Sequence, residues 1–248
     1  MKPETEKPWI HSALREIDRV ANLTTEERAE EVRREDDDRR EEQKERNRQY
    51  KARMRQEQLV EAGISPRHID AKIEFLEKSE DWRRMFHQIS DNLGRGFTIG
   101  LVGHRGTGKT QAATECIRQL IHGGFRNLPL IIKARRIILT VQSSFKSSRT
   151  TELDVIPKFT KPDLLVIDEY GQRGKSTEST WCDELMFDVL DRRYDYCRDT
   201  IIISNQSIAQ FTKDIGPSVC DRMSECGGII DCAWPSFRQN ANHQPHER

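Results

Sequence analysis

The stretch FTIGLVGHRGTGKT, residues 97–110, decides the fold of this chain. Residues 97–102 form a short apolar run that is typical of a buried strand, and apolar side chains at helical spacing follow from Ala113 to Ile121. Between them lies the pattern GxxxxGK[ST], which marks a phosphate-binding loop when it connects a strand to a helix. The context as well as the string therefore predicts a nucleotide-binding α/β domain.

The residue types in this loop fit the chemistry of phosphate binding. Gly103, Gly106 and Gly108 allow the backbone to curl so that successive N–H groups point at phosphate oxygens, and the following helix presents its positive end to the same charge. Lys109 is expected to reach the β- and γ-phosphates, and Thr110 to offer its hydroxyl to Mg²⁺. The residues assigned to nucleotide binding are Gly103, His104, Arg105, Gly106, Thr107, Gly108, Lys109 and Thr110.

Two residues within the loop are larger than those found in many loops of this type. We expect the side chains of His104 and Arg105 to point to solvent while their backbone groups serve the phosphates. An additional charge clamp from Arg105 is the alternative, and no other feature of the sequence supports it.

The segment LLVIDEY, residues 164–170, predicts the second half of the site. Its four apolar residues are typical of a central strand in a parallel sheet, and ligands bind at the carboxyl ends of such strands. We expect Asp168 to hold Mg²⁺, directly or through water. Because Glu169 can polarise a water molecule for attack on the γ-phosphate, the Asp-Glu pair favours an NTP hydrolase over a phosphotransferase.

A further apolar strand, residues 200–203, ends at Ser204 and Asn205. The Asn205 amide would lie beside the Asp-Glu pair, where it could orient the attacking water or sense the γ-phosphate. An asparagine after a strand is otherwise a common turn residue. In total, strands are expected near residues 97–102, 129–133, 163–167, 200–204 and 228–232.

The first 62 residues differ in character from the rest of the chain. From Glu26 to Arg55, 22 of 30 residues are charged, which predicts a solvated helix that begins at a capping box of Thr24 and Glu27. Apolar residues at helical spacing between Trp9 and Leu23 predict a short amphipathic helix whose exposed stripe needs a partner. We place the boundary to the following domain near Ala62.

The overall composition excludes several classes of protein. Lys plus Arg number 41 and Asp plus Glu number 41, so any DNA contact must come from a local patch rather than from net charge. The chain has no apolar run of membrane-spanning length and its start, MKPETEKPWI, has no signal-peptide pattern, so we expect a cytoplasmic protein without membrane contact. The six cysteines form no C-x-x-C pair and are expected to be reduced thiols with packing roles.

Four segments of the chain, taken in order, resemble one family. They are DLLVIDEYGQRG (residues 163–174), DRRY (191–194), TIIISNQS (200–207) and GPSVCDRMSECGG (216–228). Together they look like the DnaC/DnaI-type helicase loaders of bacteria and phages, which are AAA+ ATPases, and the related IstB transposition helpers share much of the pattern. The resemblance covers about residues 63–238, and EAGISPRHIDAKIEF (61–75) also looks like the approach to the ATPase core of these loaders.

This resemblance implies a three-layer α/β P-loop AAA+ domain with a parallel five-stranded sheet, no C-terminal lid and a helical N-terminal arm. Residues 1–62 would form the arm and residues 63–248 the ATPase domain, with a polar tail from about residue 239. The resemblance also implies an ATPase that uses ATP and Mg²⁺, binds a hexameric replicative DNA helicase through the arm, and places it on single-stranded DNA. Hydrolysis would occur at subunit interfaces of an oligomer in the bacterial cytoplasm. The protein would be encoded by a cellular or a phage gene.

By the same resemblance, Arg222 matches the arginine finger of the family, which completes the active site of a neighbouring subunit. A guanidinium supplied in trans would stabilise charge on the transferring phosphoryl group. Some relatives carry a further arginine four residues earlier, where this chain has Ser218, so the resemblance does not extend to a second contact of this kind. The expected catalytic residues are therefore Glu169, Asn205 and Arg222.

The resemblance further implies that the ATPase domain binds single-stranded DNA. A groove that follows a DNA backbone needs cations and a few stacking surfaces, and Phe145 is the aromatic residue in the loop concerned. An ordinary basic surface is the alternative interpretation. The candidate cations are Lys133, Arg135, Arg136, Lys146, Arg149, Lys158 and Lys161.

Two other functions stay open at this point. An IstB-like transposition helper ATPase would act on a transposase and duplex DNA instead of a helicase. An adaptor protein would use ATP as a structural clamp without significant turnover. Capture of a helicase by the arm, and phosphate release with and without single-stranded DNA, distinguish the three.

Overall fold

The computed structural model describes residues 24–145, 151–171 and 179–239. The chain divides into two compact units, residues 1–54 and 55–248, which are described separately below. The second unit begins before the expected boundary near Ala62, because Leu59, Ala62 and Ile64 are buried in its hydrophobic core. The amphipathic helix expected between Trp9 and Leu23 lies outside the described residues.

Helix α2, Thr25–Glu61, contains the charged stretch. It begins at the predicted capping box, in which the Thr24 N–H donates to Oε2 of Glu27 at 2.8 Å and the Glu27 N–H donates to Oγ1 of Thr24 at 3.2 Å. Ion pairs between residues three and four apart follow, such as Arg34–Glu30 at 2.8 Å, and the side chains in them are more than half exposed. The predicted solvated helix is confirmed for the described residues.

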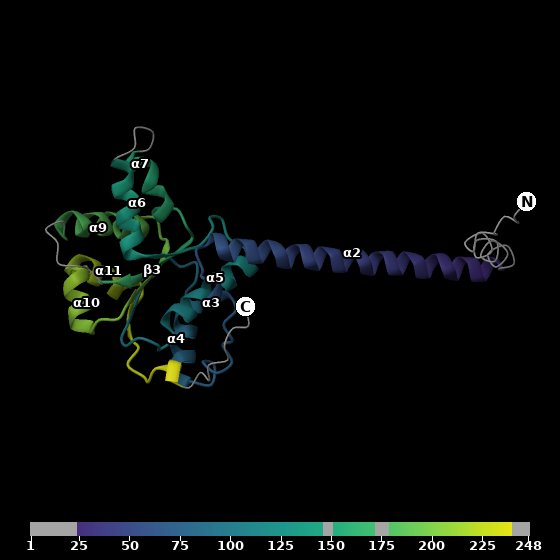
Figure 1. The fold of residues 1–248 in the computed structure, drawn as a ribbon, viewed down its shortest axis with the longest axis horizontal. Coiled ribbons are helices and arrows are strands. Elements are labelled where there is room, and N and C mark those ends of the chain that lie inside the picture. The colour runs from purple at the N-terminus through teal and green to yellow at the C-terminus, as the bar shows by residue number, and fades with distance from the viewer. Residues whose placement is uncertain (1–23, 146–150, 172–178, 240–248) are drawn as a thin grey trace, which may run out of the picture. The chain divides into compact units, whose positions relative to one another are not determined.

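A five-stranded parallel sheet forms the centre of the second unit (Figure 1). In spatial order its strands are β2 (Leu130–Lys133), β3 (Leu164–Tyr170), β4 (Asp199–Ser204), β1 (Thr98–Val102) and β5 (Gly228–Asp231). The register pairs Ile201 of β4 with Ile99 of β1 on one side and with Val166 of β3 on the other. Strand β4 therefore lies between the strand that precedes the phosphate loop and the strand that carries the acidic pair.

Helices cover both faces of this sheet (Figure 1). Their bounds are α3 Pro66–Ile69, α4 Glu80–Ser90, α5 Lys109–Gly123, α6 Ala134–Phe145, α7 Glu152–Val155, α8 Pro157–Thr160, α9 Ser179–Asp195, α10 Ile208–Ile215, α11 Pro217–Cys226 and the 3-10 helix η1 Phe237–Gln239. In β3, Leu164 and Val166 pack in one hydrophobic cluster with α4 and α5, whereas Leu165 and Ile167 pack in a second cluster with α6 and α8 to α11. This alternation follows the pleat of the strand, and it confirms the expected three-layer α/β architecture.

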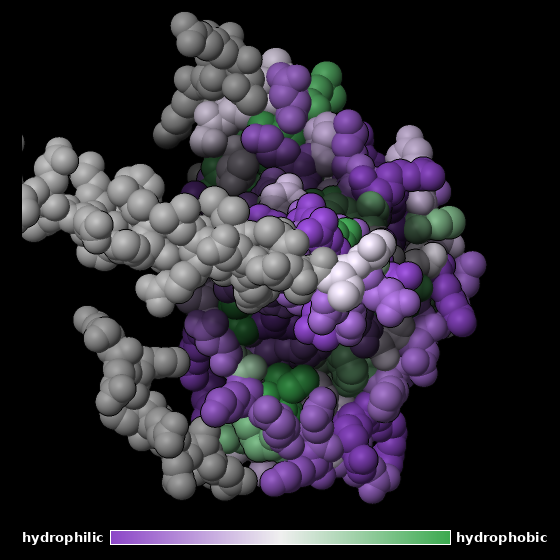
Figure 2. Space-filling model, turned by 90° about the vertical axis from the view of Figure 1, so that its right-hand side faces the viewer, coloured by the Kyte–Doolittle hydropathy of each residue, from purple (hydrophilic) through white to green (hydrophobic). Residues whose placement is uncertain are grey.

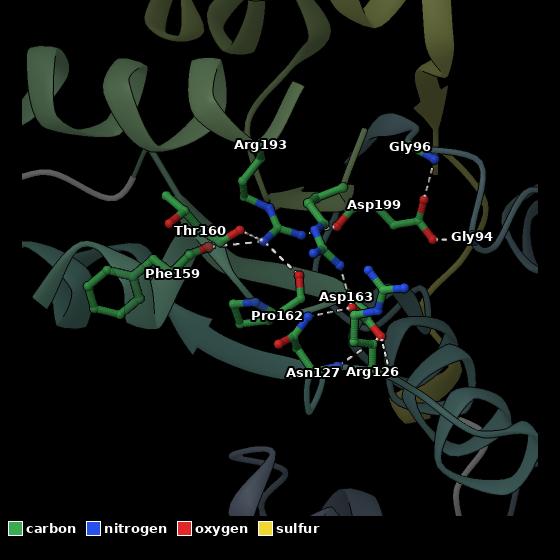
Figure 3. A network of polar contacts seen from close by, with 11 residues as sticks. Gly94, Gly96, Arg126, Asn127, Phe159, Thr160, Pro162, Asp163, Arg193 and Asp199 are labelled. Carbon is green, nitrogen blue, oxygen red and sulfur yellow. Dashed lines mark hydrogen bonds and ion pairs between the residues drawn. The ribbon is translucent and has the colours of Figure 1, made fainter. Parts of the chain in front are cut away.

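Arg193 of α9 is buried at the amino ends of the strands (Figure 3). It is the arginine before the tyrosine in DRRY, and it is 0% exposed. Its guanidinium donates to the carbonyl oxygens of Phe159 at 3.0 Å and Pro162 at 2.9 Å, and to Oγ1 of Thr200 at 2.9 Å. Burial lowers the pKa of Arg193, but the surrounding oxygen acceptors favour its charged form. This residue of the motif therefore holds the domain together and lies away from the phosphate loop.

Two aspartates extend the network around Arg193 (Figure 3). The Asp199 carboxylate accepts the N–H of Gly96 at 2.7 Å, and the Asp163 carboxylate accepts the N–H of Asn127 at 3.0 Å and pairs with Arg198. Buried and partly buried polar contacts thus connect the segments at the starts of β1, β3 and β4 to one another.

The described helices, the surface and the cysteines can be compared with the expectations of no membrane span and of reduced cysteine thiols. No helix in the described part of the chain is long and apolar enough to cross a membrane. Figure 2 shows a face that is mostly hydrophilic, with hydrophobic residues in small, separate patches. The six cysteines are free, and Cys116, Cys182 and Cys232 are buried in packing positions.

Candidate nucleotide-binding site

The phosphate loop, residues 103–108, connects β1 to α5 as the sequence predicts. Gly106 and Gly108 have φ angles of 87° and 82°, in the left-handed region that favours glycine. A side chain at Gly108 would also collide with its surroundings, since an added Cβ would lie 2.6 Å from Nε1 of Trp82. Backbone conformation thus requires both glycines, and close packing requires the second one again.

Lys109 is the first residue of α5, and its side chain turns back into the loop. It is 5% exposed, and its ammonium donates to the carbonyl oxygens of Gly103 at 2.8 Å and His104 at 2.6 Å and to Oγ1 of Thr107 at 3.2 Å. Burial lowers the pKa of this ammonium. Charged phosphate oxygens are stronger acceptors than neutral carbonyls, so the position of Lys109 suits a bound triphosphate.

His104 and Arg105 are both exposed, as the sequence predicts. The backbone of His104 contributes to the loop through its carbonyl oxygen, which accepts Nζ of Lys109 and, at 3.1 Å, Oγ1 of Thr107. Arg105 lies at the border of the cavity described below. The structure therefore shows solvent-facing side chains at both positions, with Arg105 on the cavity side.

Thr110 and Asp168 meet at the inner edge of the site. Oγ1 of Thr110 lies 3.3 Å from Oδ2 of Asp168, although the two residues are 58 positions apart. Burial raises the pKa of Asp168, which means that the ionised carboxylate lacks the solvation it would have in water. A hydroxyl and a carboxylate side by side are the oxygen ligands that Mg²⁺ prefers, and a cation would stabilise the buried charge. The residues present therefore fit Mg²⁺.

Glu169 adopts an unusual backbone conformation directly after Asp168. Its φ angle is 56°, and a register shift between Ile167 and Tyr170 interrupts the pairing of β3 with β4. A left-handed conformation costs a residue with a side chain roughly 1–2 kcal/mol, and such strain often lies at functional sites. Oε1 of Glu169 accepts Nζ of Lys133 at 2.9 Å. The two carboxylates thus have different partners: Asp168 contacts Thr110 of α5, and Glu169 contacts Lys133 at the end of β2.

Asn205 follows β4 directly and lines the same cavity as Asp168 and Glu169. This placement follows from the strand order, because β4 lies between β1 and β3 and parallel strands end at the same edge of the sheet. The structure thus brings the phosphate loop, the acidic pair and Asn205 together in one site.

These residues line a cavity of about 660 Å³. Its outer wall is formed by two segments that the motifs do not include, residues 63–76 before β1 and residues 237–238 after β5. Phe75 and Phe237 meet edge to face there, with ring centroids 5.9 Å apart. Nε2 of Gln111 donates to the carbonyl oxygen of His68 at 3.3 Å and ties the first segment to α5. The cavity is large enough for a nucleotide.

Arg222 lies on α11 and is not among the described residues that line the cavity. It forms an ion pair with Asp191 of α9, and its guanidinium carbon lies over the rings of Tyr194 at 4.9 Å and Phe187 at 5.6 Å. The Tyr194 hydroxyl in turn donates to Oε2 of Glu225 at 2.6 Å. The first and last residues of DRRY therefore hold Arg222 in place, outside the cavity of its own chain.

Residues 16–243, most of the chain, match the family described as IstB-like ATP binding protein. The chain belongs to this family. The family and the fold together make this IstB-like protein an ATP-binding protein with an AAA+ ATPase fold.

Two curated relatives of the IstB-like protein are named replicative helicase loader DnaC. That of Escherichia coli K12 is 31% identical over 137 residues, which is 55% of this chain and 54% of the relative. The chain therefore spans about half the length of this relative. The DnaC of Buchnera aphidicola subsp. Schizaphis graminum is 26% identical over 199 residues, 77% of this chain and 79% of the relative.

Two solved structures support the fold. A crystal structure of the DnaC helicase loader has a TM-score of 0.56 at 19% identity and covers 67% of this chain and 99% of its own. Domain III of the Thermotoga maritima replication initiation protein DnaA has a TM-score of 0.55 at 16% identity and covers 74% of this chain and 79% of its own. At these identities the likeness shows a shared architecture only.

The basic residues proposed for DNA binding do not form one set in the IstB-like protein. Lys133 lines the nucleotide cavity and pairs with Glu169, which places it apart from the other candidates. Phe145, expected in a loop, is the last residue of α6 and meets Trp181 edge to face at 5.6 Å. The exposed candidates that remain are Arg135, Arg136, Lys158 and Lys161, whereas Lys146 and Arg149 lie outside the described residues.

Proposed function

We propose that this IstB-like protein is an ATP-dependent loader that places a hexameric replicative helicase on single-stranded DNA, in the bacterial cytoplasm. The names of the curated relatives support the replication role. The observation that carries the ATP-driven part is the division of the site: Glu169 and Asn205 line the nucleotide cavity, and Arg222 lies outside it. A second copy that offers its Arg222 to this cavity would complete the site, so hydrolysis would be coupled to assembly.

The cavity residues would have different roles in hydrolysis. The loop amides and Lys109 would bind the β- and γ-phosphates, and Thr110 and Asp168 would hold Mg²⁺. When bound, Mg²⁺ would neutralise charge on the phosphate oxygens. Glu169 would take a proton from a water molecule oriented by Asn205, while the water oxygen bonds to the γ-phosphorus and the bond to the bridging oxygen breaks. The products are ADP and inorganic phosphate.

Glu169 would have to weaken its ion pair with Lys133 to act as the proton acceptor. The Glu169 side chain is 38% exposed and that of Lys133 63% exposed. Ion pairs exposed to this degree contribute roughly 0–1 kcal/mol. Exchanging the lysine for a water molecule would therefore cost little compared with the barrier of the reaction.

Two substitutions test the proposed division of the site. Glu169→Gln is expected to keep ATP affinity and to lower turnover by about 10²–10⁴-fold, the usual contribution of a general base. Arg222→Ala is expected to lower turnover of the assembled protein on single-stranded DNA by about 10³-fold or more, with ATP affinity of the monomer unchanged. Phosphate release by both variants is compared with that of Arg192→Ala, which removes a neighbouring arginine of α9. Parental turnover by assembled Arg222→Ala protein would refute hydrolysis at a shared interface.

Helicase binding is tested with the full chain and the replicative helicase encoded in the same genome. Capture of the helicase is expected, and Ile17→Asp with Val20→Asp, two changes in the apolar stripe of residues 9–23, is expected to abolish it. The matched control is Val32→Asp, at an exposed position of α2, which should leave capture intact. Failure of the unsubstituted chain to capture the helicase would contradict the loader proposal.

A transposition helper is the second candidate, because the matched family is described as IstB-like. Capture of a transposase from the same genome, without capture of the helicase, would favour it. Tight ATP binding with no phosphate release, with and without single-stranded DNA, would favour an adaptor instead.

A further inference from the structure

Three consecutive carbonyl groups of the phosphate loop accept hydrogen bonds from outside the loop. The Phe237 N–H donates to the Gly106 oxygen at 2.9 Å, and the indole Nε1 of Trp234 donates to the Thr107 oxygen at 3.0 Å. Nε1 of Trp82, in α4, donates to the Gly108 oxygen at 3.2 Å. Two tryptophans far apart in sequence thus hold adjacent peptide groups of the loop.

The orientation of these carbonyls fixes the orientation of the amides that follow. In a trans peptide the C=O of one residue and the N–H of the next point in opposite directions. Because the indoles bind the carbonyl oxygens of Thr107 and Gly108, the N–H groups of the next residues, Gly108 and Lys109, point away from the indoles. Residues 105–108 of the loop line the nucleotide cavity, whereas neither Trp82 nor Trp234 is among its described lining residues. The indoles thus contact the loop on the side that does not face the cavity.

The glycines of the loop explain why hydrogen bonds from outside the loop are needed to fix the orientation of its peptide groups. Glycine adopts positive and negative φ angles with similar ease, so peptide groups next to Gly106 and Gly108 can rotate at little steric cost. A rotated peptide would turn a carbonyl oxygen toward the phosphates and repel them. Lys109 donates to the carbonyls of Gly103 and His104. The Gly108 carbonyl also accepts the Ala112 N–H of α5 at 2.9 Å, so Trp82 adds a second donor there, whereas the Thr107 carbonyl accepts from Trp234.

We propose that Trp82 and Trp234 are positioning residues of the nucleotide site, which keep the loop amides directed at the phosphates through their indole N–H groups. The segment after β5 thereby becomes a working part of the site. This inference rests on nucleotide binding and is independent of the helicase and of DNA.

The test compares the ATP affinity of the full-length protein with that of Trp234→Phe, which keeps an aromatic ring and removes the donor. A hydrogen bond of this kind contributes about 0.5–1.5 kcal/mol, so we expect a dissociation constant about three- to tenfold higher. Trp181→Phe is the matched control, because Trp181 packs against Phe145 and not against the loop. An ATP affinity of Trp234→Phe within twofold of that of Trp181→Phe would overturn the proposal.

A second measurement covers the case in which the substitution disturbs folding. In the unsubstituted protein, the indole N–H resonance of Trp234 is expected to shift when ADP is added, and that of Trp181 to stay in place. A Trp234 resonance that does not move would overturn the proposal even if Trp234→Phe is unstable. If the parent protein does not bind ATP at all, nucleotide binding itself fails, and that outcome differs from normal parental binding with an unaffected variant.

Discussion

Two arginines, Arg34 in α2 and Arg193 in α9, show how differently the two units of this chain are stabilised. Arg34 pairs with Glu30 at 2.8 Å, and its side chain is 75% exposed. Arg193 is fully buried and donates to oxygens from two separate segments of the ATPase domain. The first makes a contact within one turn of helix, whereas the second joins α9 to the approach to β3 and to β4.

This difference predicts two kinds of response to perturbation. In residues 25–54 each ion pair is local and exposed, so its loss should affect about one turn of helix and little else. In the ATPase domain the loss of a buried donor leaves acceptors unsatisfied in several elements, so the whole domain should respond. Substitutions that remove one arginine from each unit can therefore test the contrast directly.

The largest effect is expected from Arg193→Met. Methionine is of similar length but leaves the carbonyl groups of Phe159 and Pro162 without their donor, and each unsatisfied buried group costs about 1–3 kcal/mol. We expect the free energy of unfolding of the ATPase domain to fall by at least about 3 kcal/mol, measured by urea denaturation. Arg192→Met, at the adjacent half-exposed position, is the control and should cost less than about 1 kcal/mol. Equal losses in the two variants would contradict a structural role for the network.

A smaller effect of opposite sign is expected from Asp168→Asn. Burial raises the pKa of Asp168 in the folded protein, so its ionised form destabilises the domain at pH values above that pKa, and the cost disappears as pH falls through it. Asparagine removes the charge and can still accept the Glu169 N–H, a contact of 2.7 Å in the parent. In the absence of ligand we expect a melting temperature about 2 °C higher at pH 7.

Asp168→Asn should also be stabilised less by ATP with Mg²⁺, because the negative charge that would hold the metal is gone. ATP with Mg²⁺ is expected to raise the melting temperature of the parent and to raise that of Asp168→Asn much less, as measured by thermal unfolding with and without the metal. A variant that is destabilised without ligand, or stabilised by ATP and Mg²⁺ as strongly as the parent, would show that Asp168 is a structural residue.

The fold and the centre of the site could be predicted from the sequence because their signals are local. The apolar runs before Gly103 and Asp168 predicted β1 and β3, and the loop between β1 and α5 carries its glycines and Lys109 in one short string. Four strands differ from their expected bounds by one residue, whereas β3 continues through the acidic pair to Tyr170.

The remaining parts of the site depend on strand order and on contacts between distant segments. Lys133 was one of the candidate cations for DNA, and its place beside Glu169 at the nucleotide cavity follows from the pairing of β2 with β3. Trp234 and Thr107 are 127 positions apart, and no spacing rule connects them. Phe237 and Arg238 were given no role in the site, but they line the cavity because the chain returns over the loop after β5. A tryptophan and a phenylalanine in an otherwise polar C-terminal stretch were the signal available.

The smallest effect is expected in α2, from Arg34→Ala. Loss of one exposed pair of this type costs about 0.2–0.5 kcal/mol, so hydrogen exchange of nearby amides should speed up by no more than about twofold, and only within residues 25–54. High salt should act on the whole stretch at once, because the Debye length falls to roughly 3 Å at 1 M, while the amides of β3 should be unaffected. Gln43→Ala, which removes an uncharged contact with Asn47, should leave the salt response of the helix unchanged. Faster hydrogen exchange throughout residues 25–54 in Arg34→Ala would mean that this part of α2 unfolds as cooperatively as the ATPase domain. The contrast between the two arginines would then no longer hold.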